Sequence, residues 1–335
     1  MQRIEEIYWL RAYGCLAVFS FHLLDHLNQR VDTLATDLAR IPTVLGTPIF
    51  IFISIFLFSM RYGRDIPQGF LGSRVKYVMV PYLVYGLAYS LAEFLRLQAN
   101  GVETGLVETL REYLVYAGWH GYFLIIAAQF YAFYWLYGRF DLARWLPATP
   151  WLLIGMAWWG YWQWRSSLPP GYLHWIAPLG WLYLFFLAMV LVKHYQDTPE
   201  ARPAWLVALA RPRWLVALIG LVVLLSLPGW LEYSSKEVWV VPLFLLFTLW
   251  IMGRLRGRPA PPLVRRLNEF SFGIYLAHPM FFNLVDVLDP GQRLPLALYV
   301  LALAVIGMAG SIAWNLTANR VQWGGLLFGK RLRVA

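Results

Sequence analysis

Charged residues are scarce in this chain. Asp, Glu, Lys and Arg make up only 14% of its 335 residues, whereas hydrophobic residues make up 60%. Globular domains average about 25% charged and about 45–50% apolar residues. A water-soluble fold of this length would leave large apolar patches exposed to water. The composition therefore excludes a soluble enzyme and a disordered chain, and it indicates a protein that crosses a membrane many times.

Cysteine is almost absent as well. The single cysteine, Cys15, lies in the first apolar run, so no intrachain disulfide can form and a disulfide-stabilised scaffold is excluded. The net charge of +10 would suit a nucleic-acid partner in a soluble protein, but in a membrane protein an excess of Lys and Arg follows from topology. We therefore expect the lipid bilayer as a partner, no nucleic acid and no metal site. The sequence does not predict the oligomeric state.

Long apolar runs bounded by charged residues predict about ten transmembrane helices. The predicted fold class is all-α, a polytopic integral membrane helical bundle that forms a single domain over residues 1–335. The predicted spans are 7–27, 43–61, 77–97, 121–138, 149–164, 174–193, 214–231, 238–253, 271–288 and 295–315.

The distribution of basic residues predicts the orientation of these spans. If the N-terminus is cytoplasmic, 20 of the 28 Lys and Arg residues fall on the cytoplasmic side and seven on the opposite side. Cytoplasmic loops of membrane proteins carry such an excess. We therefore expect both termini in the cytoplasm.

Ionisable residues concentrate in the first span, where they are costly and usually serve a function. His22, Asp25 and His26 have i, i+3 and i+4 spacing, so they share one helix face. Arg11 precedes His22 by close to three turns and points the same way, about 16 Å deeper. Arg11 either belongs to this polar stripe or reaches the inner headgroups, and His26 suits the outer interface. His22, with Asp25 as an orienting partner, is the candidate general base.

A basic segment surrounds the cytoplasmic mouth of the third span. It contains Arg61, Arg64, Arg74 and Lys76. These residues are either ordinary topology-determining charges or a clamp for a phosphate-rich cytoplasmic ligand, because Arg binds phosphate in a bidentate way.

Aromatic and amide side chains mark the fourth span. Trp119, His120 and Tyr122 lie at its predicted outer end, and Gln129 lies in its middle. Aromatic residues at this position either form a membrane-interface belt or stack on sugar rings.

A histidine followed by proline interrupts the ninth span. Pro279 has no N–H group, so it allows a kink after His278 and frees a backbone carbonyl near Tyr275.

Together and in this order, these segments resemble the membrane-bound acyltransferase family 3 over residues 1 to about 290. The matching segments are an Arg-x10-His pattern at Arg11 and His22, an F-x-x-S-G-F-L pattern at 50–57 with Ser54 in the serine position, an R-x-x-R-I-x-P-x-Y pattern at 74–82, and an S-x-G-I-Y-L-x-H-P pattern at 271–279. The segment with His120, Phe123, Gln129 and Tyr131 is similar to members encoded with surface polysaccharides. Two departures are Ile55 in place of a glycine and Lys76 in place of a second, well-spaced arginine.

The resemblance implies transfer of an acyl group, acetyl or succinyl, from cytoplasmic acyl-CoA to a hydroxyl of an extracytoplasmic or lipid-linked glycan. It implies a bacterial inner membrane as the location and acyl-CoA as a donor substrate, with no permanently bound cofactor. His22 would take the proton of the attacking hydroxyl, and a covalent acyl-His or acyl-Ser step stays an alternative. Arg11, deeper along the donor's path, and Asp25, which would fix the tautomer, are expected to be catalytic together with His22. The other expected roles are donor binding by Ser54, Arg61, Arg64, Arg74 and Lys76, oxyanion donation by Ser54 or Tyr275, and acceptor binding by Trp119, His120, Tyr122 and Gln129.

Two other classes of protein fit the same composition. An exporter or flippase of a polysaccharide or lipid-linked sugar also needs many spans, buried charge and interior aromatic residues. A receptor or assembly scaffold is the third alternative, although it gains little from a buried Arg11 and His22. An exporter need not bind or consume acyl-CoA, so binding of acyl-CoA distinguishes an acyltransferase from an exporter.

Overall fold

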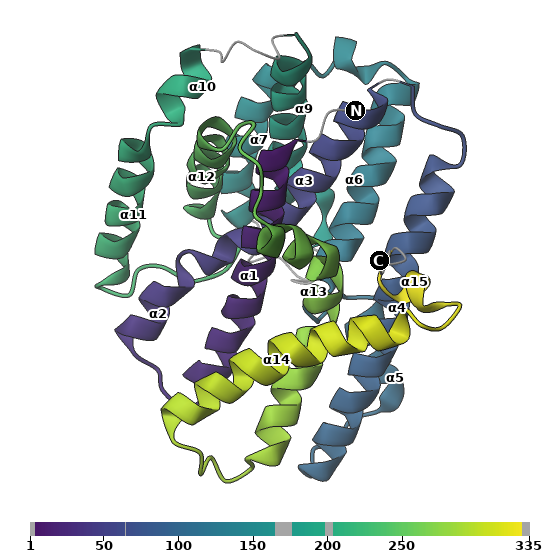
Figure 1. Ribbon diagram of the computed structural model, residues 1–335, viewed down its shortest axis with the longest axis vertical. Coiled ribbons are helices and arrows are strands. Elements are labelled where there is room, and N and C mark those ends of the chain that lie inside the picture. Colours follow the sequence, from purple (N-terminus) through teal and green to yellow (C-terminus); the bar gives the residue numbers. More distant parts are fainter. Residues whose placement is uncertain (1–3, 64, 165–175, 198–203, 330–335) are drawn as a thin grey trace. The chain divides into compact units, whose positions relative to one another are not determined.

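Figure 1 shows the computed structural model, which describes residues 4–63, 65–164, 176–197 and 204–329. Within these ranges the regular structure is entirely helical, and no strand occurs. The predicted all-α class is therefore confirmed.

Each of the ten apolar runs contains a helix. The long helices are α1 (Glu5–Asn28), α3 (Gly46–Tyr62), α4 (Phe70–Ala99), α6 (Tyr122–Arg139), α7 (Ala148–Trp164), α9 (Leu182–Asp197), α11 (Pro212–Ser226), α12 (Val240–Arg254), α13 (Pro262–Leu288) and α14 (Leu296–Ala318). Shorter helices connect or follow them, namely α2 (Leu34–Arg40), η1 (Thr43–Leu45), α5 (Leu106–Leu114), η2 (Leu142–Arg144), η4 (Pro178–Trp181), α10 (Ala204–Leu209) and α15 (Gly324–Leu327).

Five helical segments in the described part of the chain are long and apolar enough to cross a bilayer. They are α1, the run Leu34–Tyr62 that includes α2 and α3, α4, α13 and α14. Three further apolar helices are shorter, in α9, α11 and α12. These lengths agree with a polytopic membrane bundle. The count of ten spans and the cytoplasmic position of both termini stay predictions.

Backbone contacts divide the chain into two compact units. Unit 1 comprises Met1–Ile53 and His194–Val321, and unit 2 comprises Ser54–Lys193 and Gln322–Ala335. That the whole chain acts as one domain stays a prediction.

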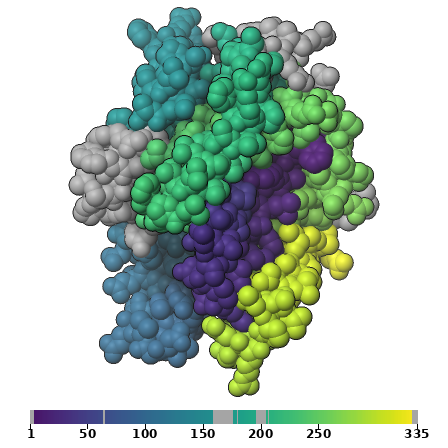
Figure 2. All heavy atoms as spheres, turned by 90° about the vertical axis from the view of Figure 1, so that its left-hand side faces the viewer, coloured from purple at the N-terminus to yellow at the C-terminus, as the bar shows by residue number. Residues whose placement is uncertain are grey.

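The core of unit 1 lies where α13 packs against α1 and α14, and α14 crosses α13 in Figure 1. Buried apolar side chains from all three helices meet there, including Phe19, Phe282 and Leu303. Gly307 permits this close packing, because a Cβ atom at its position would lie 2.3 Å from a ring carbon of Phe282. A Cβ atom at Gly46 would likewise lie 2.3 Å from the Val18 side chain of α1. The face in Figure 2 shows the N-terminal helices between α11 and α14.

Unit 2 is built around α4, which packs against α5, α6 and α15. Its interior is rich in aromatic rings. Phe133 of α6 packs on Phe185 of α9 with the ring centroids 4.6 Å apart, and Tyr137 contacts the same ring at 5.3 Å. The hydroxyl of Tyr134 donates to the backbone carbonyls of Phe58 and Gly63, which fixes the end of α3 within this unit.

Candidate functional site

Two histidines from different helices of unit 1 lie side by side. The rings of His22 on α1 and His278 on α13 have centroids 5.2 Å apart and an interplanar angle of 42°. His278 is fully buried, and its Nδ1 lies 2.8 Å from the carbonyl oxygen of Ile274. A carbonyl only accepts hydrogen bonds, so this contact assigns the proton of the neutral ring to Nδ1 and the lone pair to Nε2. The sequence singled out both histidines, but their proximity is a finding of the structure.

Aromatic rings surround His278. The ring centroids of Phe19, Tyr275 and Phe282 lie 5.7, 6.3 and 5.4 Å from that of His278. Pro279 lies inside α13, where it cannot donate to the carbonyl of Tyr275. The histidine pair therefore has an apolar wall on the α13 side, where electrostatic interactions are stronger than in water.

His22 and Asp25 are brought together, as their spacing predicts. His22 Nδ1 lies 3.5 Å from Asp25 Oδ2, at the long limit of a hydrogen bond. The other carboxylate oxygen of Asp25 is 2.5 Å from the Arg40 guanidinium at the end of α2. Arg40 is therefore the nearer partner of Asp25, and it holds the carboxylate that faces His22. Arg40 lies in the next helix and belongs to no motif, so no local pattern in the sequence marks it as a partner of Asp25.

A second polar network lies one turn further along α1. His26 Nδ1 is 2.6 Å from Asp286 Oδ2, and the Tyr299 hydroxyl donates to Asp286 Oδ1 at 2.6 Å. The Arg30 guanidinium lies 3.3 Å from the Tyr299 ring centroid and donates to Asp289 at 2.8 Å. This network joins α1, α13 and α14 beside the histidine pair. We expected His26 at the outer interface, and its side chain is only 13% exposed and is paired with α13.

Asp289 ends α13 and lies outside the membrane-spanning segments. Burial raises the pKa of this carboxyl, but the hydrogen bonds from Arg30 and from the backbone N–H groups of Arg293 and Leu294 lower the pKa by more. The net pKa is below its usual range, so Asp289 is charged at neutral pH and anchors Arg30.

Three other residues predicted for catalysis or donor binding are Arg11, Tyr275 and Ser54. Arg11 is half-buried on α1, eleven residues before His22, and helix geometry places it about 16 Å along the same side. Tyr275 is buried, with its ring centroid 5.9 Å from that of Phe50. Ser54 is half-buried in α3, next to the fully buried Ile55. Their roles in catalysis or donor binding stay predictions.

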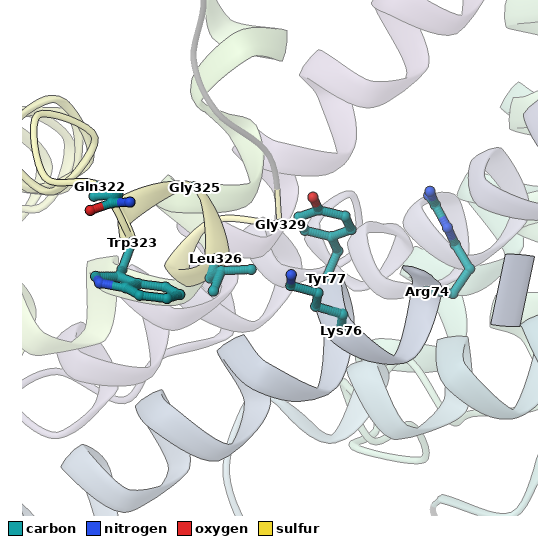
Figure 3. A pocket seen from close by; sticks show the side chains of 8 residues that line it. All are labelled: Arg74, Lys76, Tyr77, Gln322, Trp323, Gly325, Leu326 and Gly329. Carbon is teal, nitrogen blue, oxygen red and sulfur yellow. The ribbon is translucent and has the colours of Figure 1, made fainter. Parts of the chain in front are cut away.

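A pocket of about 760 Å³ lies in unit 2, between the start of α4 and the segment around α15 (Figure 3). Arg74, Lys76 and Tyr77 line it from α4. The lining residues from the C-terminal segment are Gln322, Trp323, Gly325, Leu326 and Gly329. The sequence predicted the two basic residues, whereas the C-terminal segment belongs to no motif that would have marked it.

Neighbouring side chains position Arg74. Its guanidinium carbon lies 5.0 Å from the ring centroid of Phe58 and 5.8 Å from that of Phe70, and its Nε donates to the Ser73 hydroxyl at 3.3 Å. Among the other basic residues predicted for donor binding, Arg61 lies 5.1 Å from the ring centroid of Tyr62, and Arg64 lies outside the described residues.

Trp119 and His120 pack together just before α6, with ring centroids 4.9 Å apart. Tyr89 of α4 contacts both rings, at 5.4 Å from Trp119 and 5.0 Å from His120. Gly121 allows this arrangement, because a Cβ atom there would lie 2.3 Å from the Trp119 ring. Tyr122 begins α6, and Gln129 lies two turns further along it. The structure thus adds tyrosines of α4 to the predicted aromatic group.

The sequence of the chain matches the profile of a known protein family. The profile of a family described as an acyltransferase domain, acyltransferase 3, matches residues 4–315. The chain belongs to the acyltransferase 3 family. The resemblance predicted from the sequence motifs is therefore confirmed.

Relatives of this acyltransferase 3 chain have two kinds of name. It is 28% identical to "Putative membrane-bound acyltransferase YfiQ" of Bacillus subtilis, over 98% of this chain and 95% of the relative. It is 24% identical to "Probable poly-beta-1,6-N-acetyl-D-glucosamine export protein" of Staphylococcus aureus, over 92% of this chain and 93% of the relative. No solved structure matches the chain.

The family and the helices together define the general activity. The chain is a multi-pass membrane protein and an acyltransferase. The histidine pair of unit 1 has side chains suited to proton transfer, and the basic pocket of unit 2 has side chains suited to anion binding.

Proposed function

We propose that this acyltransferase transfers an acetyl or succinyl group from cytoplasmic acyl-CoA to a hydroxyl of an extracytoplasmic or lipid-linked glycan, at a bacterial inner membrane. His22 is the general base. The observation that carries this proposal is the position of His22, with Asp25 at 3.5 Å on its own helix and the His278 ring at 5.2 Å on α13.

The chemistry requires one group that accepts and then returns a proton. His22 takes the proton of the acceptor hydroxyl while the hydroxyl oxygen attacks the thioester carbonyl. When the tetrahedral intermediate collapses, the carbon–sulfur bond breaks and the protonated imidazole gives its proton to the departing CoA sulfur. The products are an acyl ester and CoA with a free thiol. An imidazole suits both steps because its pKa lies near neutral pH.

Asp25 and Arg40 support His22 in this role. The carboxylate of Asp25 faces Nδ1 of His22, so it favours the tautomer with a proton on Nδ1 and the lone pair on Nε2. Arg40 binds the opposite oxygen of Asp25 and fixes the carboxylate in place. Tyr275, buried beside His278, is the proposed donor to the oxyanion, and Ser54 is the alternative donor.

The basic pocket of unit 2 is the proposed donor site. Arg74 and Lys76 line the pocket, and the phosphates of CoA are the polyanion that this pair would bind. Arg11 is proposed as a further cation on the donor's path. Trp119, His120, Tyr122 and Gln129 are proposed for the acceptor, because stacked aromatic rings beside polar groups suit a sugar.

The export names of the staphylococcal relatives favour a second candidate. Under that alternative the chain moves a polysaccharide or lipid-linked sugar across the membrane, and no thioester is consumed. The acyltransferase family match over residues 4–315 favours acyl transfer as the main proposal.

The test uses purified protein in nanodiscs with acetyl-CoA or succinyl-CoA and a hydroxyl-bearing oligosaccharide. We expect wild-type protein to release free CoA thiol and to form an acyl ester, and His22→Ala to do neither while it stays folded. His194→Ala is the matched control, since it removes an imidazole of α9 that packs on Trp205. If folded wild-type protein cleaves neither thioester, and cells that lack the protein retain the glycan inside, the exporter is correct.

A further inference from the structure

The pocket that contains Arg74 and Lys76 has a second wall, which comes from the C-terminal end of unit 2. We propose that this segment, Gln322–Gly329, forms the nucleotide-binding half of the pocket and that Trp323 stacks on the adenine ring of a 3′-phosphorylated adenosine. The inference rests on the proposed function, since it assigns the adenosine end of the acyl-CoA donor to particular residues.

The segment is firmly attached to α4. Phe328 is only 2% exposed, and its ring centroid lies 6.3 Å from that of Tyr85 on α4. Gly324 and Gly325 are buried, so the α15 backbone itself packs against its surroundings. Gly329 has a φ of +66°, which a residue with a side chain rarely adopts. The segment that carries Trp323 is therefore packed as part of unit 2.

Trp323 has the exposure expected of a binding platform. Its side chain lines the pocket but is 69% exposed, whereas Phe328 five residues later is buried. In Figure 3, Trp323 and Gln322 lie at one end of the pocket, Leu326 lies between them and Lys76 and Tyr77 of α4, and Arg74 lies at the other end. An aromatic face at one end and two cations further along match a base joined to phosphates.

The size of the pocket agrees with this ligand. About 760 Å³ falls within the range of roughly 300–1,000 Å³ that is typical of small-molecule sites. The amide of Gln322, next to Trp323, offers both a donor and an acceptor for the edge of the base. Two cations alone would bind any phosphate, and the tryptophan is the feature that favours a nucleotide.

An anionic lipid headgroup shares the phosphate chemistry of the donor. Tryptophan is also common at membrane interfaces, where it contacts headgroups. The test must therefore separate a nucleotide phosphate from a lipid phosphate. Nanodiscs made of phosphatidylcholine alone carry no net charge, and nanodiscs with added phosphatidylglycerol supply the competing anion.

The experiment measures the Kd of full-length protein in phosphatidylcholine nanodiscs for CoA, adenosine 3′,5′-bisphosphate and 4′-phosphopantetheine. We expect Trp323→Ala to raise the Kd of CoA and of adenosine bisphosphate by roughly tenfold, because base stacking is lost. The Kd of phosphopantetheine, which has no base, should stay unchanged. Arg74→Ala should weaken the nucleotide as well. Trp230→Ala is the matched control, since Trp230 is 74% exposed and belongs to unit 1.

Turnover gives a second readout. Trp323→Ala should raise the KM for acyl-CoA with little change in kcat, because the residue would contact the adenosine of the donor and not the reacting thioester. Trp323→Phe should restore part of the affinity, since it keeps an aromatic face.

Three results would overturn the inference. If wild-type protein binds the nucleotide and Trp323→Ala binds it equally well, the C-terminal segment is not the adenine site, although the proposed function stands. If wild-type protein binds neither CoA nor the nucleotide, the proposed donor site fails together with the inference. If phosphatidylglycerol, and not the nucleotide, stabilises the protein through Arg74, the pocket is a lipid-headgroup site.

Discussion

The imidazoles of His22 and His278 lie with their ring centroids 5.2 Å apart, one on α1 and the other on α13. The contact of His278 Nδ1 with the Ile274 carbonyl leaves Nε2 as the nitrogen with the lone pair. The His278 ring also packs against the ring of His22, so it limits the positions that the His22 imidazole can take. We therefore assign His278 as a positioning residue for the proposed base.

His278→Asn tests this assignment. The asparagine amide can still donate to the carbonyl of Ile274, so the fold should be kept, but the Nε2 atom is removed. We expect kcat to fall roughly tenfold or more, because the His22 imidazole loses the ring that holds it in position. The KM for acyl-CoA should change little, and the pH–rate profile should shift. An unchanged kcat and pH profile would show that His278 has only a packing role.

Tyr299→Phe tests the network beside the histidine pair. Tyr299 is 1% exposed, and its hydroxyl donates to Asp286, which also binds His26. We expect the variant to lose about 1–2 kcal/mol of stability, because a buried hydrogen bond to a carboxylate is removed. The measurement is unfolding in detergent, combined with Asp286→Asn in a double-mutant cycle. Additive effects of the two substitutions would show that the hydrogen bond contributes nothing.

The sequence predicted the helices well but not the contacts between them. Long apolar runs and their charged borders indicated the ten long helices of the described residues, because a bilayer demands about 20 apolar residues for each crossing. The pairing of His22 with Asp25 followed from helical spacing alone. Arg40, Asp286 and Tyr299 could not be found in this way, since they meet His22 and His26 only through the packing of other helices.

The basic pocket of unit 2 likewise combines residues that a local pattern reveals with residues that only packing brings together. Arg74 and Lys76 were predicted because clustered basic residues at the mouth of a span have a recognisable pattern. Trp323 comes from more than 200 residues later in the chain, just before a helix of four residues. No local period or motif marks such a residue, and only the packing of α15 on α4 brings it to the same pocket as Lys76.

Gly307→Ala tests how tightly α13 and α14 pack. A Cβ atom at this position would lie 2.3 Å from the Phe282 ring, so the two helices must move apart. We expect a loss of about 1–3 kcal/mol, which is typical of overpacking. Gly220→Ala is the matched control, because a Cβ atom there meets no atom within 4 Å. That variant should keep or raise stability, since alanine favours a helix more than glycine does. Equal stabilities of the two variants would contradict this account of the packing.

Lys236→Met tests a pH dependence of stability. Lys236 lies in the loop between α11 and α12, and burial lowers its pKa from 10.5 to about 7. The unfolded chain therefore binds a proton between pH 7 and about pH 10.4 that the folded chain does not bind, so this lysine makes stability rise with pH in that window. Below pH 7 Lys236 is protonated in both the folded and the unfolded chain, so burying its charge destabilises the fold by the full amount.

We expect Lys236→Met to be more stable than wild type near pH 7, and the difference to shrink as the pH rises toward 10. Thermal unfolding of both proteins across this range gives the measurement. Lys193→Met, which removes an exposed lysine, should show no such trend. A difference that does not depend on pH would contradict the lowered pKa.

His22 is proposed to transfer the proton in acyl transfer. The most direct test is single-turnover transfer from bound acetyl-CoA to an oligosaccharide by wild type and His22→Ala, with the Kd of acetyl-CoA measured for both. We predict an unchanged Kd and a rate that falls by about 100-fold or more, as expected for loss of a general base. Transfer by folded His22→Ala at the wild-type rate would contradict the account.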